Sequence, residues 1–338
     1  MGPFCIFAEI RSNSSIKNKL KQLMSNSKIS AAAFADTKPH YDLLDGLRGV
    51  AALMVIFYHV FEAFATSPID QQFNHGYLAV DFFFILSGFV IGYAYDDRWK
   101  TMTTKDFIKR RLIRLHPMVV LGAVLGVIAF YIQGCEKWDG THVSISMVML
   151  ALLINLFLIP AVPGNILYAL FIRRMSTKAL TALIVLAGIG LASFAIFNFS
   201  GAGHLGVGWT MEEYNLIGGF LRVLFSFSMG LLMSRVFKPI HVKGAFWICS
   251  LAIVVLLSMP YVGDGEALWM NGIYDSVCAI LIFPMLVYLG ASGKTTDKHS
   301  ARICKFLGDI SYPLYMVHYP LIYLYFGWVK KENLTFAE

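Results

Sequence analysis

Apolar runs long enough to cross a lipid bilayer recur along most of this 338-residue chain. A membrane-spanning helix needs about 20 mostly apolar residues, because each residue adds about 1.5 Å across a hydrocarbon core about 30 Å thick. The pattern predicts an all-α fold, a polytopic integral membrane helical bundle of about nine or ten spans, and it excludes an ordinary soluble domain. The candidate spans are 47–66, 76–95, 115–133, 144–172, 178–198, 215–235, 244–262, 273–291 and 311–329.

The basic residues predict how these spans are oriented. Alternate segments hold 23 of the 28 Lys and Arg residues, namely 1–40, 96–114, 173–178, 235–243 and 292–310. The positive-inside rule therefore places these segments and the N-terminus in the cytoplasm. The same rule accounts for the formal net charge of +7 without a nucleic-acid partner.

The two ends of the chain differ from the apolar middle. We expect residues 1–40 to form a cytoplasmic basic tail, partly disordered or lying on the membrane surface. A specific targeting signal is the alternative, although the apolar run 4–8 is too short for a signal-peptide core. Residues 330–338 form the C-terminal end. The five cysteines are scattered and predict neither a disulfide framework nor a metal site.

Arg48 and His59 lie eleven residues apart on the first apolar run. At about 100° and 1.5 Å per residue, this spacing puts both side chains on nearly the same helix face, about 16 Å apart along the axis. Ionisable groups within a bilayer usually line a polar cavity. His59 is the candidate proton acceptor, or a structural histidine bonded to a neighbouring helix. Arg48 is an anion site, a partner for Asp45, or a basic anchor at the interface.

Four further segments carry candidate residues. Asp81 is an intramembrane carboxylate, either functional or part of a structural ion pair, and Ser87 with Gly88 permits close helix packing. Arg110, Arg111 and Arg114 precede a span, and guanidinium groups on one helix face suit phosphate binding as well as cytoplasmic anchoring. Supporting residues are also expected within two later spans: Arg222, with Glu212, Glu213 or Asp81 as its partner, and His318, which could bond a carbonyl that Pro320 frees.

Taken together, four motifs of this chain resemble the acyltransferase-3 family of bacterial membrane proteins that O-acylate sugars. They are Arg48-x10-His59, the Val80–Phe89 segment, the Arg111-x-x-Arg114 pair before Pro117, and Ser311-Tyr312…Tyr315…His318…Pro320. The resemblance covers residues 41–329, which we take as the transmembrane acyltransferase domain. It implies a location in the bacterial plasma (inner) membrane.

The resemblance also implies an activity. An acyl group, usually acetyl, would pass from cytoplasmic acyl-CoA to a hydroxyl of a glycan or lipid-linked sugar, on an envelope or exported polysaccharide. His59 would be the catalytic histidine, with Arg48 beside it, and Arg110, Arg111 and Arg114 would hold the acyl donor. His59 would act as a general base or form a covalent acyl-histidine. The expected partners are acyl-CoA, the sugar acceptor and membrane lipid, with no bound cofactor and no metal.

Two departures from the family pattern suggest a shortened chain. A Trp-Ser-Leu…Glu segment is expected near the outer face, but Pro163 is followed directly by Gly164 within the overlong run 144–172, which also contains Pro160. A further span is expected after His318. An internal deletion and a truncated C-terminus would make the chain an inactive acyltransferase. The alternative from another class is a transporter or exporter of a polar metabolite, although no internal repeat supports it.

Overall fold

Helices make up the regular structure of the part of the chain that the structure describes. The computed structural model describes residues 40–136, 140–156, 168–201, 203–208, 210, 212–295, 297–332 and 334–335. Nearly all of the expected N-terminal tail, and the Pro160–Gly164 segment where a deletion is suspected, lie outside these residues. The fold class is confirmed, because the described elements form a polytopic bundle of apolar helices.

Six described helical segments are long and apolar enough to cross a membrane, so this is an integral membrane protein. They are α3 (Asp42–Glu62), η1 with α4 (Asn74–Leu78 and Ala79–Tyr95), α5 (Thr104–Gln133), α8 (Thr177–Ile196), α9 (Glu213–Val236), and the run η5, α11, η6, α12 (Gly265–Ala267, Trp269–Val277, Cys278–Ile282, Phe283–Ser292). The predicted spans at 144–172 and 244–262 correspond to shorter described helices, α6 (Ile145–Leu156) and α10 (Ala245–Ser258). The predicted span 311–329 lies within α13 (Lys298–Glu332).

Helix α5 begins well before the predicted span 115–133. Thr103 and Asp106 form a reciprocal capping box, in which each side chain accepts a hydrogen bond from the other residue's backbone N–H, and the helix then runs on past Pro117. Much of the basic segment expected to connect two spans is therefore helical. Arg111 and Arg114 thus lie on a rigid element, three residues apart on one face.

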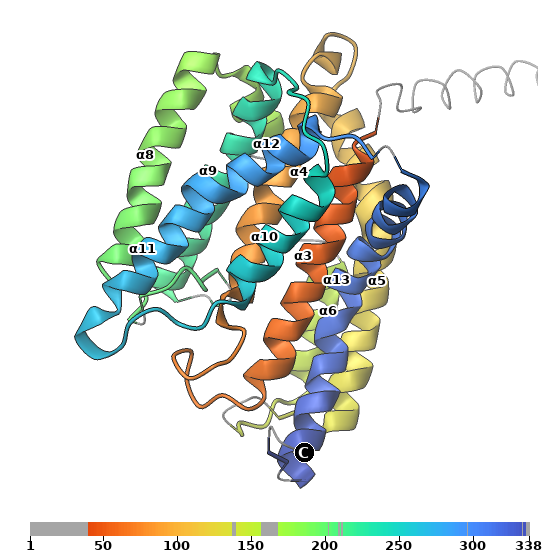
Figure 1. The fold of residues 1–338 in the computed structure, drawn as a ribbon. Coiled ribbons are helices and arrows are strands. Elements are labelled where there is room, and N and C mark those ends of the chain that lie inside the picture. The colour runs from red at the N-terminus through yellow and green to blue at the C-terminus, as the bar shows by residue number, and fades with distance from the viewer. Residues whose placement is uncertain are drawn as a thin grey trace, which may run out of the picture. The chain divides into compact units, whose positions relative to one another are not determined.

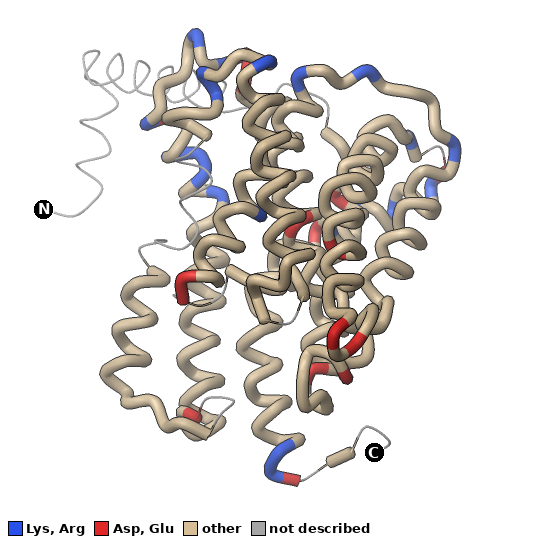
Figure 2. Tube along the Cα trace, turned by 90° about the vertical axis from the view of Figure 1, so that its left-hand side faces the viewer, with Lys and Arg blue, Asp and Glu red and all other residues tan. Residues whose placement is uncertain are grey.

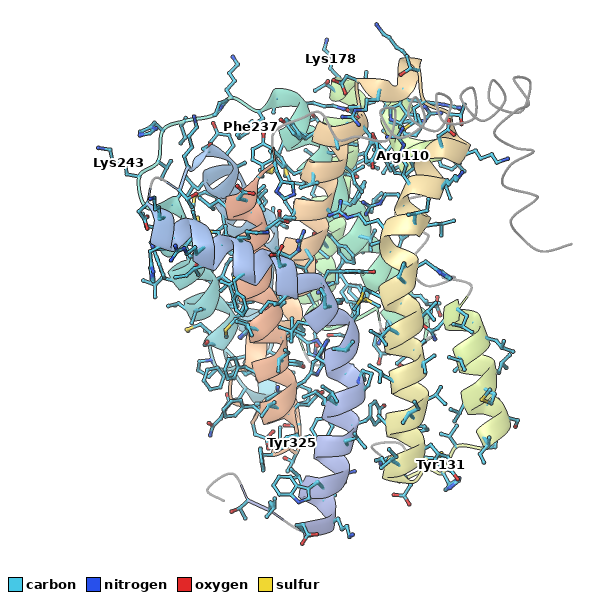
Figure 3. All side chains as sticks on the ribbon, turned by 90° about the vertical axis from the view of Figure 1, so that its right-hand side faces the viewer. Arg110, Tyr131, Lys178, Phe237, Lys243 and Tyr325 are labelled. Atoms are coloured by element: carbon cyan, nitrogen blue, oxygen red, sulfur yellow. The ribbon has the colours of Figure 1, made fainter. Side chains whose placement is uncertain are left out.

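Helix α13 lies between α3 and α5 (Figures 1 and 3). Two glycines allow this close packing. A Cβ at Gly49 of α3 would collide with the backbone carbonyl of Leu307, and a Cβ at Gly122 of α5 would collide with that of Met316. These contacts fix the side of α3 and of α5 that faces α13.

Helices α4 and α9 pack equally closely. A Cβ at Gly88 would collide with the carbonyl of Phe227, and one at Gly230 would collide with the carbonyl of Ile85. The predicted close packing at Gly88 is therefore confirmed. Ser87, beside it, is only half-buried.

The two ends of the bundle differ in charge. Lys and Arg gather at one end (Figure 2), where Arg110, Lys178 and Lys243 also lie in Figure 3. We call this the basic end. Tyr131 and Tyr325 lie at the opposite end. Between the ends, α5 and α6 expose apolar side chains such as Ile128 and Leu150, as expected of surfaces that face lipid.

Candidate active site

Arg48 and His59 both face α13, as the eleven-residue spacing predicts. The Arg48 Nε donates a hydrogen bond of 2.8 Å to the Ser311 Oγ of α13, and its Nη2 lies 2.7 Å from the Asp45 Oδ1. One turn from the other end of α3, the ring of His59 lies 5.5 Å from the ring of His318 between centroids. The pairing of Arg48 with Asp45 was one of the predicted alternatives, and the contact with Ser311 adds a second helix to it.

Arg111 and Arg114 bring further positive charge to this face from α5. The charge of Arg114 acts on both Arg48 and Arg111, and Arg111 also interacts with Tyr312 of α13. The Tyr312 hydroxyl in turn donates to the Leu115 carbonyl at 2.9 Å, which ties α13 to α5. We call Arg48, Arg111 and Arg114 the arginine cluster.

The members of the arginine cluster differ in exposure, which bears on what the cluster can bind. Arg114 is exposed, and the structure records no hydrogen bond or ion pair for it among the described residues, whereas Arg111 is half-buried. Arg110 is also half-buried, on the next position of the helix. Like charges held this close favour a bound anion, and guanidinium groups match the geometry of phosphate oxygens.

His59 is held by a carboxylate on its own helix. Its Nδ1 lies 2.8 Å from the Glu62 Oε2, three residues further along α3. An ionised carboxylate only accepts hydrogen bonds, so Nδ1 carries the proton and the lone pair of the neutral ring is on Nε2. The His59 side chain is 18% exposed, so a substrate can reach it. This arrangement has the elements of a general base and its orienting group.

His318 has the same tautomer for a different reason. Its Nδ1 lies 2.8 Å from the Tyr315 carbonyl oxygen, which can only accept, so Nδ1 donates and Nε2 holds the lone pair. The predicted bond to a carbonyl freed by Pro320 is wrong. The freed carbonyl belongs to Met316 and faces Gly122, whereas the ring reaches back to residue i−3.

Aromatic rings surround the two histidines. Tyr58 and Tyr319 each lie 5.0 Å from the His59 ring between centroids, and Tyr315 lies 5.6 Å from the His318 ring. Such rings exclude water while leaving phenolic oxygens available for hydrogen bonding. We call His59, Glu62 and His318 with these tyrosines the histidine site.

Asp81 and Arg222 form a buried ion pair between α4 and α9. The guanidinium of Arg222 on α9 binds the Asp81 carboxylate of α4 through Nε at 3.1 Å and Nη2 at 2.6 Å, and both residues are at most 1% exposed. Arg222 also donates to the carbonyls of Val207 and Tyr77, each at 2.8 Å. Of the three predicted partners of Arg222, the structure selects Asp81. The pair joins two helices and a loop, so its contacts are those of a structural ion pair.

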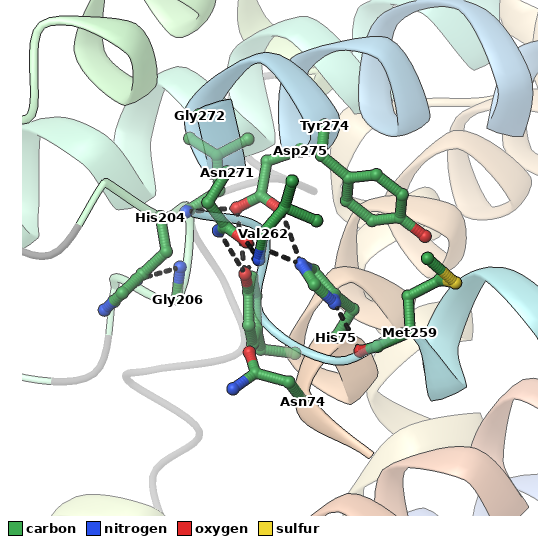
Figure 4. Close-up of polar contacts among 12 residues, drawn as sticks. Asn74, His75, His204, Gly206, Met259, Val262, Asn271, Gly272, Tyr274 and Asp275 are labelled. Atoms are coloured by element: carbon green, nitrogen blue, oxygen red, sulfur yellow. Dashed lines mark hydrogen bonds and ion pairs between the residues drawn. The ribbon is translucent and has the colours of Figure 1, made fainter. Parts of the chain in front are cut away.

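A second buried polar network joins η1, α11 and two loops (Figure 4). The Asn271 Oδ1 contacts the His75 Nε2 at 2.9 Å and accepts from the Val262 N–H at 3.1 Å. Asp275 accepts from the Tyr77 hydroxyl at 3.0 Å and from a backbone N–H at 2.7 Å. No group of three metal-ligating side chains occurs among the described residues.

The sequence pattern missed Glu62, Tyr315 as a contact of His318, and the whole network around Asp275. A signal existed for Glu62, because residues i and i+3 of a helix are neighbours and a carboxylate there reaches a histidine. The network was not recognisable, since its members are separated by up to 198 residues.

The comparisons with known proteins agree with the motifs. Residues 41–337 match the acyltransferase-3 family, described as an acyltransferase domain. The chain belongs to this family. The predicted resemblance is thereby confirmed.

Relatives include a protein of Staphylococcus aureus (strain COL) named as an O-acetyltransferase, 25% identical over 82% of this chain and 50% of its own length. Acyltransferase MdmB of Streptomyces mycarofaciens is 24% identical over 82% of this chain and 78% of its own. A Rhizobium radiobacter protein named protein 2 in picA locus is 45% identical over 25% of this chain and 42% of its own. The chain thus spans about half the length of the first two curated relatives that it matches. No solved structure matches it.

Proposed function

We propose that this family member transfers an acyl group, acetyl in the first instance, from acyl-CoA to a hydroxyl of a glycan. Family membership and the relatives named as acyltransferases support the reaction class. The observation that carries the proposal is the shared face of α3 and α13, which joins the arginine cluster near the basic end to the histidine site near the opposite end. A donor bound at one end and an acceptor at the other would meet along this face.

The arginine cluster would bind the phosphates of CoA. Asp45 partly offsets the charge of Arg48, and guanidinium groups match the geometry of the phosphate oxygens of CoA. Positive charge gathers at this end, so we place the basic end and the N-terminus in the cytoplasm of a bacterium, with the protein in the plasma membrane. The acceptor, a sugar of an envelope or exported polysaccharide, would then approach from outside.

His59 would act as the general base of the transfer. As Nε2 takes the proton of the acceptor hydroxyl, the hydroxyl oxygen attacks the thioester carbonyl carbon. The carbon–sulfur bond then breaks, and the departing thiolate takes the proton from the imidazolium, so that the products are the ester and the free thiol of CoA. Glu62 would stabilise the imidazolium formed in between, as a carboxylate does in the Ser-His-Asp triad.

His59→Ala tests this role. In membranes supplied with acetyl-CoA labelled in the acetyl group, we expect transfer to the host polysaccharide to fall by about 10²-fold or more, the range for loss of a general base. His241→Ala is the matched control, because His241 is exposed in the loop after α9. Equal transfer by the wild type and the His59→Ala variant would contradict the assignment, and a gene deletion that leaves O-acylation unchanged would contradict the function.

An acyl-histidine route would use the same Nε2. Rapid quenching with labelled acetyl-CoA in the absence of acceptor distinguishes the two routes. Label retained on the wild-type protein and lost from His59→Ala would indicate the covalent route, and its absence from both would indicate direct transfer.

A further inference from the structure

A buried imidazole nitrogen on α13 has no hydrogen-bond partner among the described residues. It is the Nε2 of His318, a residue that is only 7% exposed. The same ring's Nδ1 donates to the Tyr315 carbonyl, so Nε2 is an acceptor with an unused lone pair. Leaving a buried acceptor unpaired costs about 1–3 kcal/mol, and such atoms in a folded protein call for a functional explanation.

The hydrogen bonds of a second buried histidine show that a buried imidazole in this bundle can have partners for both ring nitrogens. His75 is fully buried and uses both ring nitrogens, with the Met259 carbonyl at 2.7 Å and the Asn271 Oδ1 at 2.9 Å. The protein therefore supplies a partner for each nitrogen of the His75 ring. His318 has a partner for one nitrogen only.

The location of His318 indicates what would occupy its acceptor. Its ring centroid is 5.5 Å from that of His59, and the two planes are inclined by 30°. Both rings hold Nδ1–H in a bond to the protein and keep Nε2 for a donor. Two imidazole rings this close together, each with an acceptor nitrogen, can bind two hydroxyl groups of one small molecule.

We propose that His318 binds the acyl acceptor, accepting through Nε2 a hydrogen bond from a hydroxyl next to the one that reacts. This inference rests on the proposed function, in which the reacting hydroxyl gives its single proton to His59, so that the hydroxyl at His318 must be another. It assigns the acceptor to a chemical class, polyols with two neighbouring hydroxyls, as in a sugar ring. His318 itself exchanges no proton in the transfer.

Two substitutions separate the functions of the two ring nitrogens. His318→Asn places an amide N–H where Nδ1 was and can keep the bond to the Tyr315 carbonyl, but removes the acceptor at Nε2. His318→Gln places an amide oxygen near Nε2 and keeps an acceptor there. We expect His318→Asn to lower kcat/KM for the acceptor by about tenfold or more, the loss of one hydrogen bond to substrate, and His318→Gln to retain most of it.

The assay uses the full-length protein in membranes with labelled acetyl-CoA. The acceptors are methyl glycosides of the sugar that the wild type acetylates, tested intact and with each hydroxyl removed in turn. Removing the hydroxyl that His318 binds should lower kcat/KM of the wild type about as much as His318→Asn does. It should not lower kcat/KM of the His318→Asn variant any further, since both changes delete the same contact. The KM for acetyl-CoA should stay constant, and equal melting temperatures in detergent establish that each variant is folded.

Three outcomes would overturn the proposal. The first is an unchanged kcat/KM in His318→Asn, and the second is an equal loss of kcat/KM in folded His318→Asn and His318→Gln. The third is that every deoxy acceptor lowers kcat/KM of His318→Asn as much as it lowers that of the wild type. Failure of the proposed function is distinct, because the wild type would then transfer no label at all.

Discussion

The chain holds two groups of ionisable residues in its interior, and they differ in how completely the protein satisfies them. At Asp81–Arg222 and around Asp275, ionisable groups are fully buried and bonded to side chains and backbone from several elements. At the histidine site, His59 is partly exposed and His318 keeps a buried acceptor without a partner. Both groups contain residues that are costly in a membrane. We infer that, of these two groups of ionisable residues, the completely bonded one holds the helices together and the incompletely bonded one is available to the proposed substrate.

The largest effect should come from breaking the satisfied group. Asp81→Asn leaves Arg222 buried without its counter-charge, and we expect a loss of about 3–5 kcal/mol in the free energy of unfolding. Thermal unfolding in detergent, followed by size-exclusion chromatography, measures it. Asp81→Leu with Arg222→Leu is the matched control and should recover much of the loss, because it removes both charges.

A stable Asp81→Asn protein that has lost only transfer activity would contradict the comparison. Asp81 would then belong with the histidine site, and its complete bonding would not have marked a structural role.

The fold was largely predictable because helix periodicity and apolar length depend on local sequence. The shared face of Arg48 and His59 follows from the turn of one helix, and α13 packs on that face as a polar stripe in a bilayer requires. Helix α5 begins before the predicted span 115–133, in agreement with the single helix face predicted for Arg111 and Arg114, because a capping box and good helix formers begin the helix there.

The site was predictable only where its members are close in sequence. Arg222 had three possible partners because 141 residues separate it from Asp81, and no local pattern says which helices are neighbours. His318 lies on a helix, α13, but its partner depended on which carbonyl the ring reaches. Its unpaired Nε2 is a property of the packed structure and has no sequence signal.

A pH experiment tests a histidine beside the buried network around Asp275, since the His204 ring lies 5.6 Å from the Tyr77 ring between centroids. His204, in the loop after α8, accepts a hydrogen bond from the Gly206 N–H at 2.8 Å through Nδ1. Burial, and then the charges of Arg222 and His75, lower its pKa to about 4. The neutral ring is favoured in the folded state, whereas the unfolded chain takes up a proton near pH 6.5.

Stability should therefore decline as the pH falls from about 6.5 to about 4, by up to about 3 kcal/mol from this residue. Melting temperatures across this range measure the decline. His204→Asn keeps an acceptor for the Gly206 N–H and has no group to titrate, so its curve should be flatter. Identical pH dependence in both proteins would remove His204 from the bonded network.

The smallest effect should come from Glu62, which is hydrogen-bonded like the buried groups but partly exposed like His59. Its carboxylate accepts from the His59 Nδ1 at 2.8 Å but is 38% exposed, so the contact stabilises the fold little. In the proposed reaction it fixes the His59 ring so that Nε2 is the base. Glu62→Gln should leave the melting temperature unchanged and lower kcat by about tenfold, equivalent to about 1.4 kcal/mol, with KM values little altered. The kcat of Glu62→Asp, which keeps the charge on a shorter side chain, should lie between those of Glu62→Gln and the wild type. A Glu62→Gln protein that is less stable but fully active would show that this carboxylate has a structural role. Exposure would then no longer distinguish the histidine site from the buried ion pair.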